Sequence, residues 1–403
     1  MKTPFPVVVQ KYGGSSVATA DKIKQVARFI QRRAKEGNRL CVVVSAMGKT
    51  TDQLLAMAHE VTRDPSRREL DMLLSCGERA SMAILAMALE ELGCPAVSLT
   101  GSQSGIITSD VHSGAKILEV RPHRVQAELD KGKIVIVAGF QGVSIYKEIT
   151  TLGRGGSDTT AVAMAAALSA ASCEIYSDVP GVFTADPKWI KDAVAIPRLS
   201  LDEMEELSLY GAKVMHSQAL QFAKAEGITI HALKTATDEI AGTLISPRRV
   251  REKLASVMLA HKDPVYHLRV SAHGLEAMVS ELIKRQIFHM QLYGWMDDAA
   301  KHWHCLIHPE DAHGFEHWSR LLQHAEREAD CSTVSLVGAG LCEMPKITAH
   351  AIHLLSLNSI DVLGMSMAPN RCTFALKEGE AVSALQLLHH ELVSGPDPGS
   401  RNV

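Results

Sequence analysis

A lysine and a pair of glycines follow the first apolar segment of the chain. The sequence Lys11-Tyr12-Gly13-Gly14 lies between the strand-like run Val7–Gln10 and a helical stretch that starts near Thr19. Glycines let backbone N–H groups approach phosphate oxygens, and a lysine at a strand end adds a positive charge. An ordinary strand-to-helix turn has the same pattern, so this segment alone does not identify a ligand.

A second glycine-rich segment carries both an arginine and an acid. Gly153-Arg154-Gly155-Gly156-Ser157-Asp158 leads into the helical stretch Asp158–Ala170, where we expect Ser157 or Asp158 to cap the helix. Capping accounts for the acid but not for an arginine held between glycines. Because a guanidinium matches a carboxylate through two parallel hydrogen bonds, this segment favours a carboxylate ligand.

Two further segments are polar where a strand should end. Ser45–Thr51 follows the strand-like run Cys41–Val44, and the carboxyl ends of strands are where open α/β sheets bind ligands. A plain polar loop explains this segment equally well. The segment from Cys173 to Lys188 combines a strand, a turn and a polar run, and its spacing does not name a ligand.

These segments can form one site only if the fold brings the ends of their strands together. The alternation of apolar and helical stretches up to about Pro247 predicts such a fold. Continuous apolar strands alternate with helices, which is typical of a mostly parallel sheet covered by helices on both faces. The expected strands are Val7–Gln10, Cys41–Ser45, Ile134–Ala138 and Glu174–Ser177. The expected helices are Asp21–Arg33, Leu70–Leu92 and Asp158–Ala170.

The composition changes after the basic run Arg248–Arg251. A strand–helix–strand order then occurs twice, beginning with the strands Val265–Val270 and Thr333–Gly338. We therefore expect two small α+β modules after the parallel sheet. The expected domains are a catalytic domain at 1–247, a first module at 248–329 and a second module at 330–403.

The charge balance of the chain favours small molecules as partners. The 42 Lys+Arg and 45 Asp+Glu residues give a net charge of −3, which provides no broad cationic surface for nucleic acid or anionic lipid. The eight cysteines form no Cys-x-x-Cys pair, which indicates reduced thiols, and no apolar run is long enough to span a membrane. We expect a cytoplasmic protein with no nucleic-acid or membrane partner.

Four of these segments together resemble the aspartokinases in order and spacing. The matching motifs are Lys-Tyr-Gly-Gly-Ser-Ser, Ser-Ala-Met-Gly-x-Thr-Thr-Asp, Gly-Arg-Gly-Gly-Ser-Asp-Thr-Thr-Ala and Cys-Glu-Ile-Tyr-Ser-Asp-Val-x-Gly-Val. Residues 73–79, 100–105, 137–142 and 211–214 resemble the intervening motifs of that family. The resemblance covers the kinase half and implies the amino-acid-kinase fold, with ATP and Mg²⁺ at the carboxyl edge of the sheet and L-aspartate facing the γ-phosphate.

The resemblance also implies roles for individual residues. Lys11 and Asp158 would be catalytic, and Mg²⁺ would be held mainly by ATP. Nucleotide contacts are implied for Lys11, Tyr12, Gly13, Gly14, Ser177, Asp178, Phe183, Lys188, Lys213 and Val214. Aspartate contacts are implied for Ser45, Thr51, Glu78, Arg154, Gly155, Gly156 and Ser157, with Arg154 on the α-carboxylate and Glu78 on the ammonium group. Phe183 stands where many relatives have tyrosine, which puts one hydroxyl near the nucleotide in doubt.

The C-terminal modules resemble the tandem ACT modules of aspartokinases, which implies a homodimer and an amino-acid effector. ACT modules often have a Pro-Gly turn beside the effector, but here Pro345 is followed by Lys346, and Ser271–Leu275 contains no proline. A side chain at the glycine position restricts the backbone. We therefore expect weak joint inhibition by lysine and threonine. Diaminopimelate or lysine is the candidate effector, by similarity to the diaminopimelate-sensitive aspartokinases, and a dimer interface without any effector is the alternative.

The expected function is ATP-dependent phosphorylation of the side-chain carboxylate of L-aspartate to 4-phospho-L-aspartate. This is the first step of the lysine/diaminopimelate, threonine and methionine pathway. One alternative is another amino-acid kinase, acting on glutamate, acetylglutamate or a nucleotide, and the combination of Arg154 with Glu78 argues against it. The other is a catalytically weak regulatory amino-acid sensor of the same family, which would be expected to have lost Lys11, Asp158 or Lys213.

Overall fold

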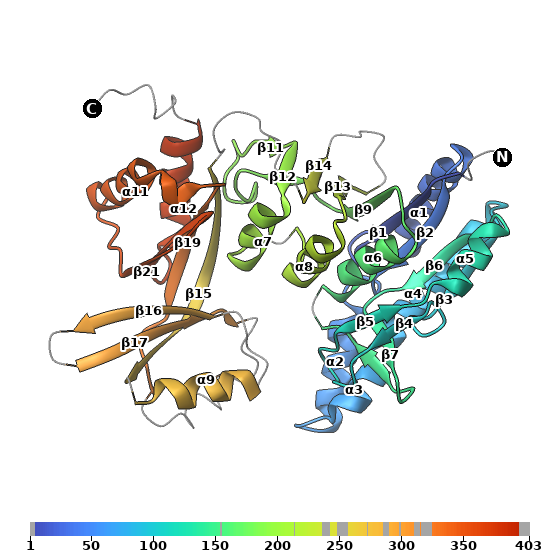
Figure 1. Ribbon diagram of the computed structural model, residues 1–403, viewed down its shortest axis with the longest axis horizontal. Coiled ribbons are helices and arrows are strands. Elements are labelled where there is room, and N and C mark those ends of the chain that lie inside the picture. The colour runs from blue at the N-terminus through green and yellow to red at the C-terminus, as the bar shows by residue number, and fades with distance from the viewer. Residues whose placement is uncertain are drawn as a thin grey trace. The chain divides into compact units, whose positions relative to one another are not determined.

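A computed structural model of the chain divides into two compact units (Figure 1). Among the described residues, the first unit contains 5–182, 195–205 and 214–247, and the second contains 183–194, 206–212 and 257–394. The structure describes residues 5–153, 155–212, 214–235, 242–247, 257–271, 273–284, 290–297, 300–309, 315 and 325–394.

A mostly parallel sheet forms the centre of the first unit. In the described chain its strand order is β12-β14-β13-β9-β1-β2-β6-β3. Neighbouring strands from β13 to β3 are all parallel, whereas β14 is antiparallel to β13, so the predicted mostly parallel sheet is confirmed. The bounds are β1 Val7–Tyr12, β2 Arg39–Val44, β3 Ala96–Leu99, β6 Ile134–Ala138, β9 Ser172–Ser177, β12 Arg198–Ser200, β13 Ile230–Lys234 and β14 Thr243–Ser246.

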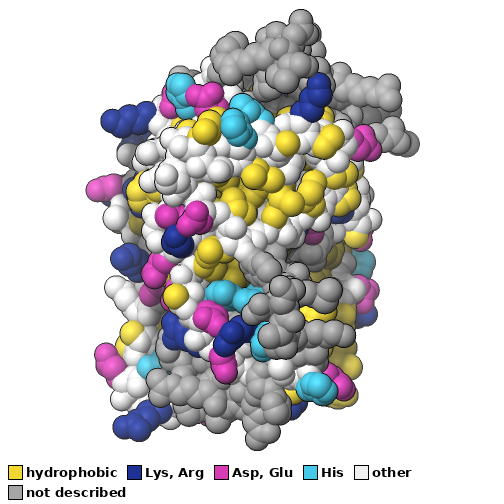
Figure 2. Space-filling model, turned by 90° about the vertical axis from the view of Figure 1, so that its left-hand side faces the viewer, with side chains coloured by type: hydrophobic (Ala, Val, Ile, Leu, Met, Phe, Trp, Pro, Cys, Tyr) yellow, Lys and Arg dark blue, Asp and Glu magenta, His cyan; other side chains and the backbone are white. Residues whose placement is uncertain are grey.

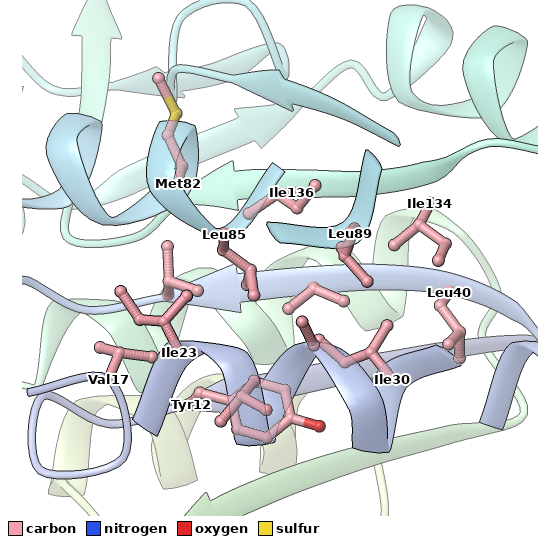
Figure 3. Packing of buried hydrophobic residues seen from close by; sticks show 14 of the residues in the cluster. Tyr12, Val17, Ile23, Ile30, Leu40, Met82, Leu85, Leu89, Ile134 and Ile136 are labelled. Atoms are coloured by element: carbon pink, nitrogen blue, oxygen red, sulfur yellow. The ribbon is translucent and has the colours of Figure 1, made fainter. Parts of the chain in front are cut away.

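Helices cover both faces of this sheet. On one face, α1 (Ala20–Lys35) and α4 (Cys76–Glu91) bury Ile30 and Leu85 against alternate strand residues (Figure 3). The helix α6 (Gly156–Ala167) contacts β1, β2 and β9 outside that cluster, and its first ten residues are all buried. Because successive strand residues face opposite sides, burial on both faces explains why the strands are apolar throughout.

The single helix expected over Leu70–Leu92 is two helices, α3 (Arg67–Leu74) and α4, which meet at Ser75. The stretch Arg67–Glu91 is long and apolar enough to cross a membrane by length and composition alone. However, Leu85 and Leu89 of α4 lie fully buried in the core of the first unit. The helix α4 is therefore packed in the core against the sheet.

A small sheet of order β5-β4-β7-β8 lies beside α3, with β8 in contact with that helix. Its last strand, β8, leads into the glycine-rich segment that precedes α6. The bounds are β4 Ile106–Thr108, β5 Ile117–Val120, β7 Gln141–Ser144 and β8 Ile149–Thr151. The other elements before residue 230 are α2 Thr50–Val61, α5 His123–Asp130, β10 Val182–Phe183, β11 Ala195–Ile196, α7 Leu201–Leu209 and α8 Ser217–Glu226.

The second unit is an antiparallel sheet with helices, as predicted for ACT-like α+β modules. Its described order is β16-β17-β15-β19-β21-β20, and β18 also pairs with β15. The long strand β15 (Met258–Ser271) pairs with β19 through its first half and with β17 through its second half, so both modules share one sheet. The other bounds are α9 Leu275–Lys284, β16 Met290–Asp297, β17 Ala300–Ile307, β18 Ala325–Arg327, β19 Cys331–Val337, α11 Pro345–Leu357, β20 Gly364–Ala368, β21 Arg371–Lys377 and α12 Ala381–His389.

Two segments that precede residue 213 are built into the second unit. Ala185 and Ile190 join the apolar core formed by β19, β21, α11 and α12. The guanidinium of Arg371, whose side chain is only 7% exposed, forms an ion pair with Glu206 at 3.1 Å and lies 4.0 Å from the centre of the Tyr210 ring. A nearly buried arginine needs such partners, so this contact fixes the segment 206–212 to the sheet.

We expect Glu206→Gln to lower the free energy of unfolding by about 2 kcal/mol, because it leaves the Arg371 charge without its carboxylate in a poorly solvated position. Urea unfolding of the variant and the wild type measures the change. The matched control is Asp361→Asn, since the Asp361–Lys377 pair lies in the same unit but is well exposed and should contribute nothing measurable. Equal effects of the two substitutions would contradict the role assigned to Glu206.

Candidate active site

The carboxyl ends of β1, β2, β6 and β9 lie at one edge of the sheet because these strands are parallel and adjacent. Lys11 is near the end of β1, where it is paired with Val43 of β2 and Ile175 of β9. Ser45 and Ser177 lie at the ends of the two neighbouring strands. The structure thus brings together residues that are far apart in the sequence.

The two glycines after β1 allow the first loop to approach its neighbours closely. The Gly13 N–H donates to the Tyr176 carbonyl at 3.3 Å, and the Gly48 N–H donates to the Gly14 carbonyl at 3.0 Å. A Cβ atom at Gly14 would lie 2.8 Å from the carbonyl oxygen of Ala46, which is too close for any other residue. Glycine at this position therefore allows the loop after β1 to pack directly against the loop after β2.

Lys11 and Asp158 form an ion pair at this edge. The Lys11 Nζ lies 2.7 Å from the Asp158 Oδ1, and the two side chains are 12% and 10% exposed. Asp158 comes from the first turn of α6, where the positive end of the helix dipole favours a carboxylate. The pair joins the end of β1 to the start of α6.

The expectation that Ser157 or Asp158 caps α6 is wrong. The helix begins at Gly156, its N-cap is Gly155 with φ +66°, and no side chain accepts a capping hydrogen bond. A Cβ atom at Gly155 would lie 2.0 Å from the Cβ of His216, so the close packing of the turn excludes a side chain. Asp158 therefore has no capping role and contacts Lys11 instead.

Ser157 lies against the loop that follows β6. A Cβ atom at Gly139 would come within 2.6 Å of the Ser157 Oγ, and the Gly139 N–H donates to the Val44 carbonyl at 3.0 Å. Gly156 packs in a similar way against Leu152 and Phe140. The turn expected to contact aspartate therefore packs on the same sheet edge. Arg154 itself lies outside the described residues.

Glu78 is a buried carboxyl group with an incomplete set of partners. It lies in the first turn of α4 and is 3% exposed. Its Oε1 accepts a hydrogen bond from the Ala46 N–H at 3.0 Å, while its Oε2 has no hydrogen-bond partner among the described residues. Burial raises the pKa of Glu78 to about 7, against the opposing effect of the backbone N–H groups. The site thus contains a carboxyl oxygen that lacks a donor.

Thr51 and the nucleotide-side residues occupy further strand and helix ends. Thr51 is the second residue of α2, which follows the β2 loop. The Ser177 Oγ contacts the backbone of Val179, and Asp178 is exposed. Val214 is half-buried in the loop before α8. Lys213 lies outside the described residues.

The side chain of Tyr12 cannot contribute to a nucleotide site. It is fully buried in the core beneath the sheet and stacks on Tyr176, with 4.9 Å between the ring centres. Because β1 alternates its side chains, Lys11 and Tyr12 face opposite sides of the sheet. Any contact of Tyr12 with a nucleotide would have to come from its backbone.

Phe183 and Lys188 belong to the second unit. Lys188 is exposed, and its Nζ lies 4.7 Å from the centre of the Trp189 ring. Both residues come from the segment whose Ala185 and Ile190 are packed into the core of that unit. Their roles in nucleotide binding stay predictions.

Sequence reasoning gave no role to Asp71, although its carboxylate is fully buried next to this region. It accepts hydrogen bonds from Thr151, Ser113 and His112. The only signal in the sequence is that three apolar residues, Met72, Leu73 and Leu74, follow Asp71. An acid beside such an apolar run is less expected to face solvent. Its partners lie 41 to 80 residues away, so no local pattern could have predicted these contacts.

In the parts of the chain that the structure describes, no three His, Cys, Asp or Glu side chains gather into a group that could hold a metal ion. The carboxylate beside Lys11, that of Asp158, is already engaged in an ion pair. Lys11 supplies the positive charge at this edge, and a lysine ammonium suits phosphate oxygens and not a cation.

Comparisons with known proteins found similar sequences and similar folds. The model of the amino acid kinase family matches residues 6–233. The aspartokinase of Bacillus sp. (strain MGA3) is 39% identical over 396 residues, which cover 95% of this chain and 96% of that protein. The E. coli aspartokinase III structure in complex with aspartate and ADP has a TM-score of 0.81 at 23% identity, covering 96% of this chain and 99% of the other. The same protein in complex with lysine and aspartate has a TM-score of 0.73 at 23% identity and the same coverage.

The raised pKa of Glu78 predicts a pH-dependent cost in stability. Its pKa is about 7 in the folded chain against an ordinary 4.5, so the folded state holds the proton more tightly. The contribution of this group to stability therefore falls as the pH rises from about 4.5 to about 7 and stays low above that. We expect Glu78→Gln to be more stable than the wild type by about 2 kcal/mol at pH 8, with little difference at pH 5.

Urea unfolding at both pH values measures this effect. The control is Glu119→Gln, because Glu119 is exposed and paired with Arg121 and should give no gain at pH 8. A difference between Glu78→Gln and the wild type that is the same at pH 5 and pH 8 would refute the assigned cause.

Proposed function

The chain belongs to the aspartokinase family, and we propose that it transfers the γ-phosphoryl group of ATP to the side-chain carboxylate of L-aspartate. The product is 4-phospho-L-aspartate, and the reaction is the first step of the lysine/diaminopimelate, threonine and methionine pathway. The observation that carries the proposal is the placement of Glu78 at the same sheet edge as the Lys11–Asp158 pair. An amino-acid site and a phosphate site are then neighbours.

The buried Glu78 carboxyl explains why the acceptor is an amino acid. Its Oε2 lacks a donor among the described residues, and a buried carboxylate without full hydrogen bonding is costly. The ammonium group of aspartate supplies both the donor and the opposite charge. A nucleotide or acetylated acceptor has no such cation, so the same site would leave Glu78 unsatisfied.

The remaining contacts to aspartate surround this anchor. Arg154 binds the α-carboxylate through its two-pronged guanidinium. The hydroxyl groups of Ser45, Thr51 and Ser157 contact its other polar groups, and Gly155 and Gly156 give the turn the room to approach. These assignments follow the family motif, and they agree with the packing of Ser157 and Gly156 at the sheet edge.

ATP is held on the β1 and β9 side of the edge. The Lys11 ammonium faces the phosphates, the small residues of the Gly13-Gly14 loop leave room for the phosphates to approach the backbone, and Lys213 adds a second positive charge. By the family motif, Ser177, Asp178 and Val214 contact the nucleotide. Asp158 holds the Lys11 side chain in one orientation through the 2.7 Å ion pair.

The transfer itself needs no general base. The aspartate carboxylate is already ionised at neutral pH, so one of its oxygens attacks the γ-phosphorus while the bond from phosphorus to the β–γ bridging oxygen breaks and ADP leaves. No proton moves in this step. The barrier lies in bringing two anions together, so catalysis depends on charge neutralisation by lysines and on positioning by the backbone. Mg²⁺ bound mainly to the phosphates would neutralise part of that charge.

The alternative of a catalytically weak amino-acid sensor is not favoured. Such a protein would be expected to have lost the phosphate lysine or its acid partner, whereas Lys11 and Asp158 are present and paired. The relatives named above, which cover almost the whole chain, are aspartokinases.

We expect Lys11→Ala and Asp158→Ala each to lower kcat by about a hundredfold or more. The first removes a positive charge that stabilises the transition state, and the second releases Lys11 from the position that the ion pair sets. Each substitution also leaves one charge without its partner in a poorly solvated place, so the thermal unfolding midpoint should fall, and kcat is measured at a temperature at which both variants stay folded. The surface substitution Lys24→Ala is the control and should leave kcat unchanged. A kcat close to the wild-type value in either site variant would remove the proposed mechanism.

Features of the second unit support the proposal that the chain forms a homodimer. Among the described strands β20 is an edge strand, and Met365 and Met367 on it are exposed. Ile352 and Leu357 of α11 are also exposed, and Figure 2 shows hydrophobic side chains gathered on one face of the molecule. An exposed apolar surface with an open strand edge is a typical protein–protein interface, and a second copy of this chain is its proposed partner.

The loop before α11 supports an altered effector. The N–H groups of Leu341, Cys342, Glu343 and Met344 already donate to backbone carbonyls, and the Gly340 N–H donates to the Asn370 side chain at 3.0 Å. Pro345 is the first residue of α11 and Lys346 follows it. The loop therefore has few backbone donors left to bind an amino acid, which favours weak joint inhibition by lysine and threonine.

We expect diaminopimelate, or failing that lysine alone, to inhibit the reaction, and we expect threonine to add little to inhibition by lysine. Initial rates at sub-saturating aspartate are measured while each amino acid is titrated separately and in the lysine–threonine pair. Strong inhibition by the pair, well beyond that by either amino acid alone, would show that the altered loop still binds effectors jointly, and this proposal would be wrong. Lack of inhibition by every amino acid would leave the dimer interface as the role of these modules.

A further inference from the structure

The carboxylate of Asp71, on the buried side of α3, accepts more hydrogen bonds than the other buried acids described above. Its Oδ1 accepts from the Thr151 hydroxyl at 2.6 Å, and its Oδ2 accepts from the Thr151 N–H at 3.1 Å. The Ser113 N–H lies 3.1 Å from both oxygens, the Ser113 hydroxyl lies 3.3 Å from Oδ1, and the His112 Nδ1 lies 2.9 Å from Oδ2. A carboxylate can accept from so many donors because its two oxygens offer about four lone-pair sites.

These contacts fix two distant segments to each other. The residue Ser113 has φ +62°, a left-handed conformation that is strained for a residue with a side chain, and its N–H and hydroxyl both point to Asp71. The next two N–H groups, of Gly114 and Ala115, donate to the Thr151 carbonyl at 3.1 and 2.9 Å. The N–H, carbonyl and hydroxyl of Thr151 are thus all engaged, and the loop wraps around it.

Thr151 is the last residue of β8 and lies directly before the turn that carries Arg154. Two backbone hydrogen bonds fix this turn at its start and at its end. The Leu152 N–H donates to the Phe140 carbonyl at 2.8 Å, and the Gly156 N–H donates to the Gly153 carbonyl at 3.1 Å. A Cβ atom at Gly153 would meet the backbone of Gly114 at 3.7 Å. The backbone at Thr151, which Asp71 binds, therefore supports the turn directly.

We propose that Asp71 is a positioning residue for the amino-acid substrate, acting through Thr151 on the turn that contains Arg154. The inference rests on the proposed function, because it assigns that turn to aspartate. Asp71 contacts neither substrate. Its hydrogen bonds to Thr151, Ser113 and His112 lead to the turn and not to Lys11 or the β1 loop, so its loss should weaken aspartate binding and leave ATP binding unchanged.

Glu174 is a buried carboxylate for which we propose no positioning role, and it serves as the control. It accepts from Gln10, Tyr176 and Arg33, each at 2.8 Å, and is nearly as buried as Asp71. Its partners lie on β1, β9 and α1, on the face of the sheet that holds the apolar core. A purely structural carboxylate should therefore behave like Glu174 when it is replaced.

The experiment measures KM for aspartate and for ATP, together with kcat, in four variants. We expect Asp71→Asn to raise KM for aspartate by about tenfold to a hundredfold, because an amide cannot accept from all of these donors, with KM for ATP within about twofold of the wild type. Thr151→Val, which removes one donor only, should show the same selectivity at smaller size. Thr151→Ser keeps the hydroxyl and should recover most of the aspartate affinity. Glu174→Gln should change stability without changing the ratio of the two KM values.

Ligand-induced shifts of the thermal unfolding midpoint give a readout that does not depend on turnover. Aspartate should raise the midpoint of the wild type but much less that of Asp71→Asn, while ADP should raise both equally. If Asp71→Asn does not fold, Thr151→Val against Thr151→Ser decides the question. Equal losses for aspartate and ATP, or no change in either KM, would overturn the inference.

The same series separates this inference from the proposed function. If the turn does bind aspartate, Arg154→Lys raises KM for aspartate whatever Asp71 does. An effect of Arg154→Lys with none from Asp71→Asn would refute the positioning role alone. A wild-type protein without aspartate-dependent ATP turnover would instead refute the proposed function.

Discussion

The ion pair between Lys11 and Asp158 joins the two elements on which the site is built. Lys11 is near the end of a central strand, and Asp158 lies in the first turn of the helix that covers that strand. The two side chains are only 12% and 10% exposed, so each needs the other to keep its charge in a poorly solvated place. An anionic substrate that approaches Lys11 therefore meets a cation whose position is already set. The parallel sheet and the helix that covers it place Lys11 and Asp158 at the same edge.

Three buried carboxyl groups in the first unit differ in how completely they are satisfied. Asp71 and Glu174 accept hydrogen bonds from several protein groups and therefore hold parts of the structure together. Glu78 keeps one oxygen without a donor among the described residues, and burial raises its pKa to about 7. The difference points to Glu78 as the group that binds a ligand, since an unsatisfied buried carboxyl is costly unless a substrate completes it. The incompletely hydrogen-bonded Glu78 therefore lowers the stability of the folded chain at the position where the amino acid is proposed to bind.

The division of the chain into units does not follow the order of the sequence. The segments 183–194 and 206–212 alternate in the sequence with segments of the first unit but are anchored in the second unit, through Ile190 in its core and Glu206 on Arg371. Two residues expected to contact the nucleotide, Phe183 and Lys188, lie on the first of these segments. Within the second unit, the long strand β15 serves both ACT-like modules, which a strand–helix–strand repeat in the sequence does not reveal.

The sequence by itself determined the parallel sheet, the α+β character of the C-terminal part and the family. Apolar strands alternating with helices, and glycines beside Lys11 and Arg154, are local patterns, and local patterns follow from backbone geometry and burial. The tertiary structure alone decided that Asp158 binds Lys11 instead of capping its helix, that Tyr12 faces the core, and that Asp71 holds the turn before α6. These outcomes depend on partners that are distant in the sequence, and their proximity is set by packing and not by spacing along the chain.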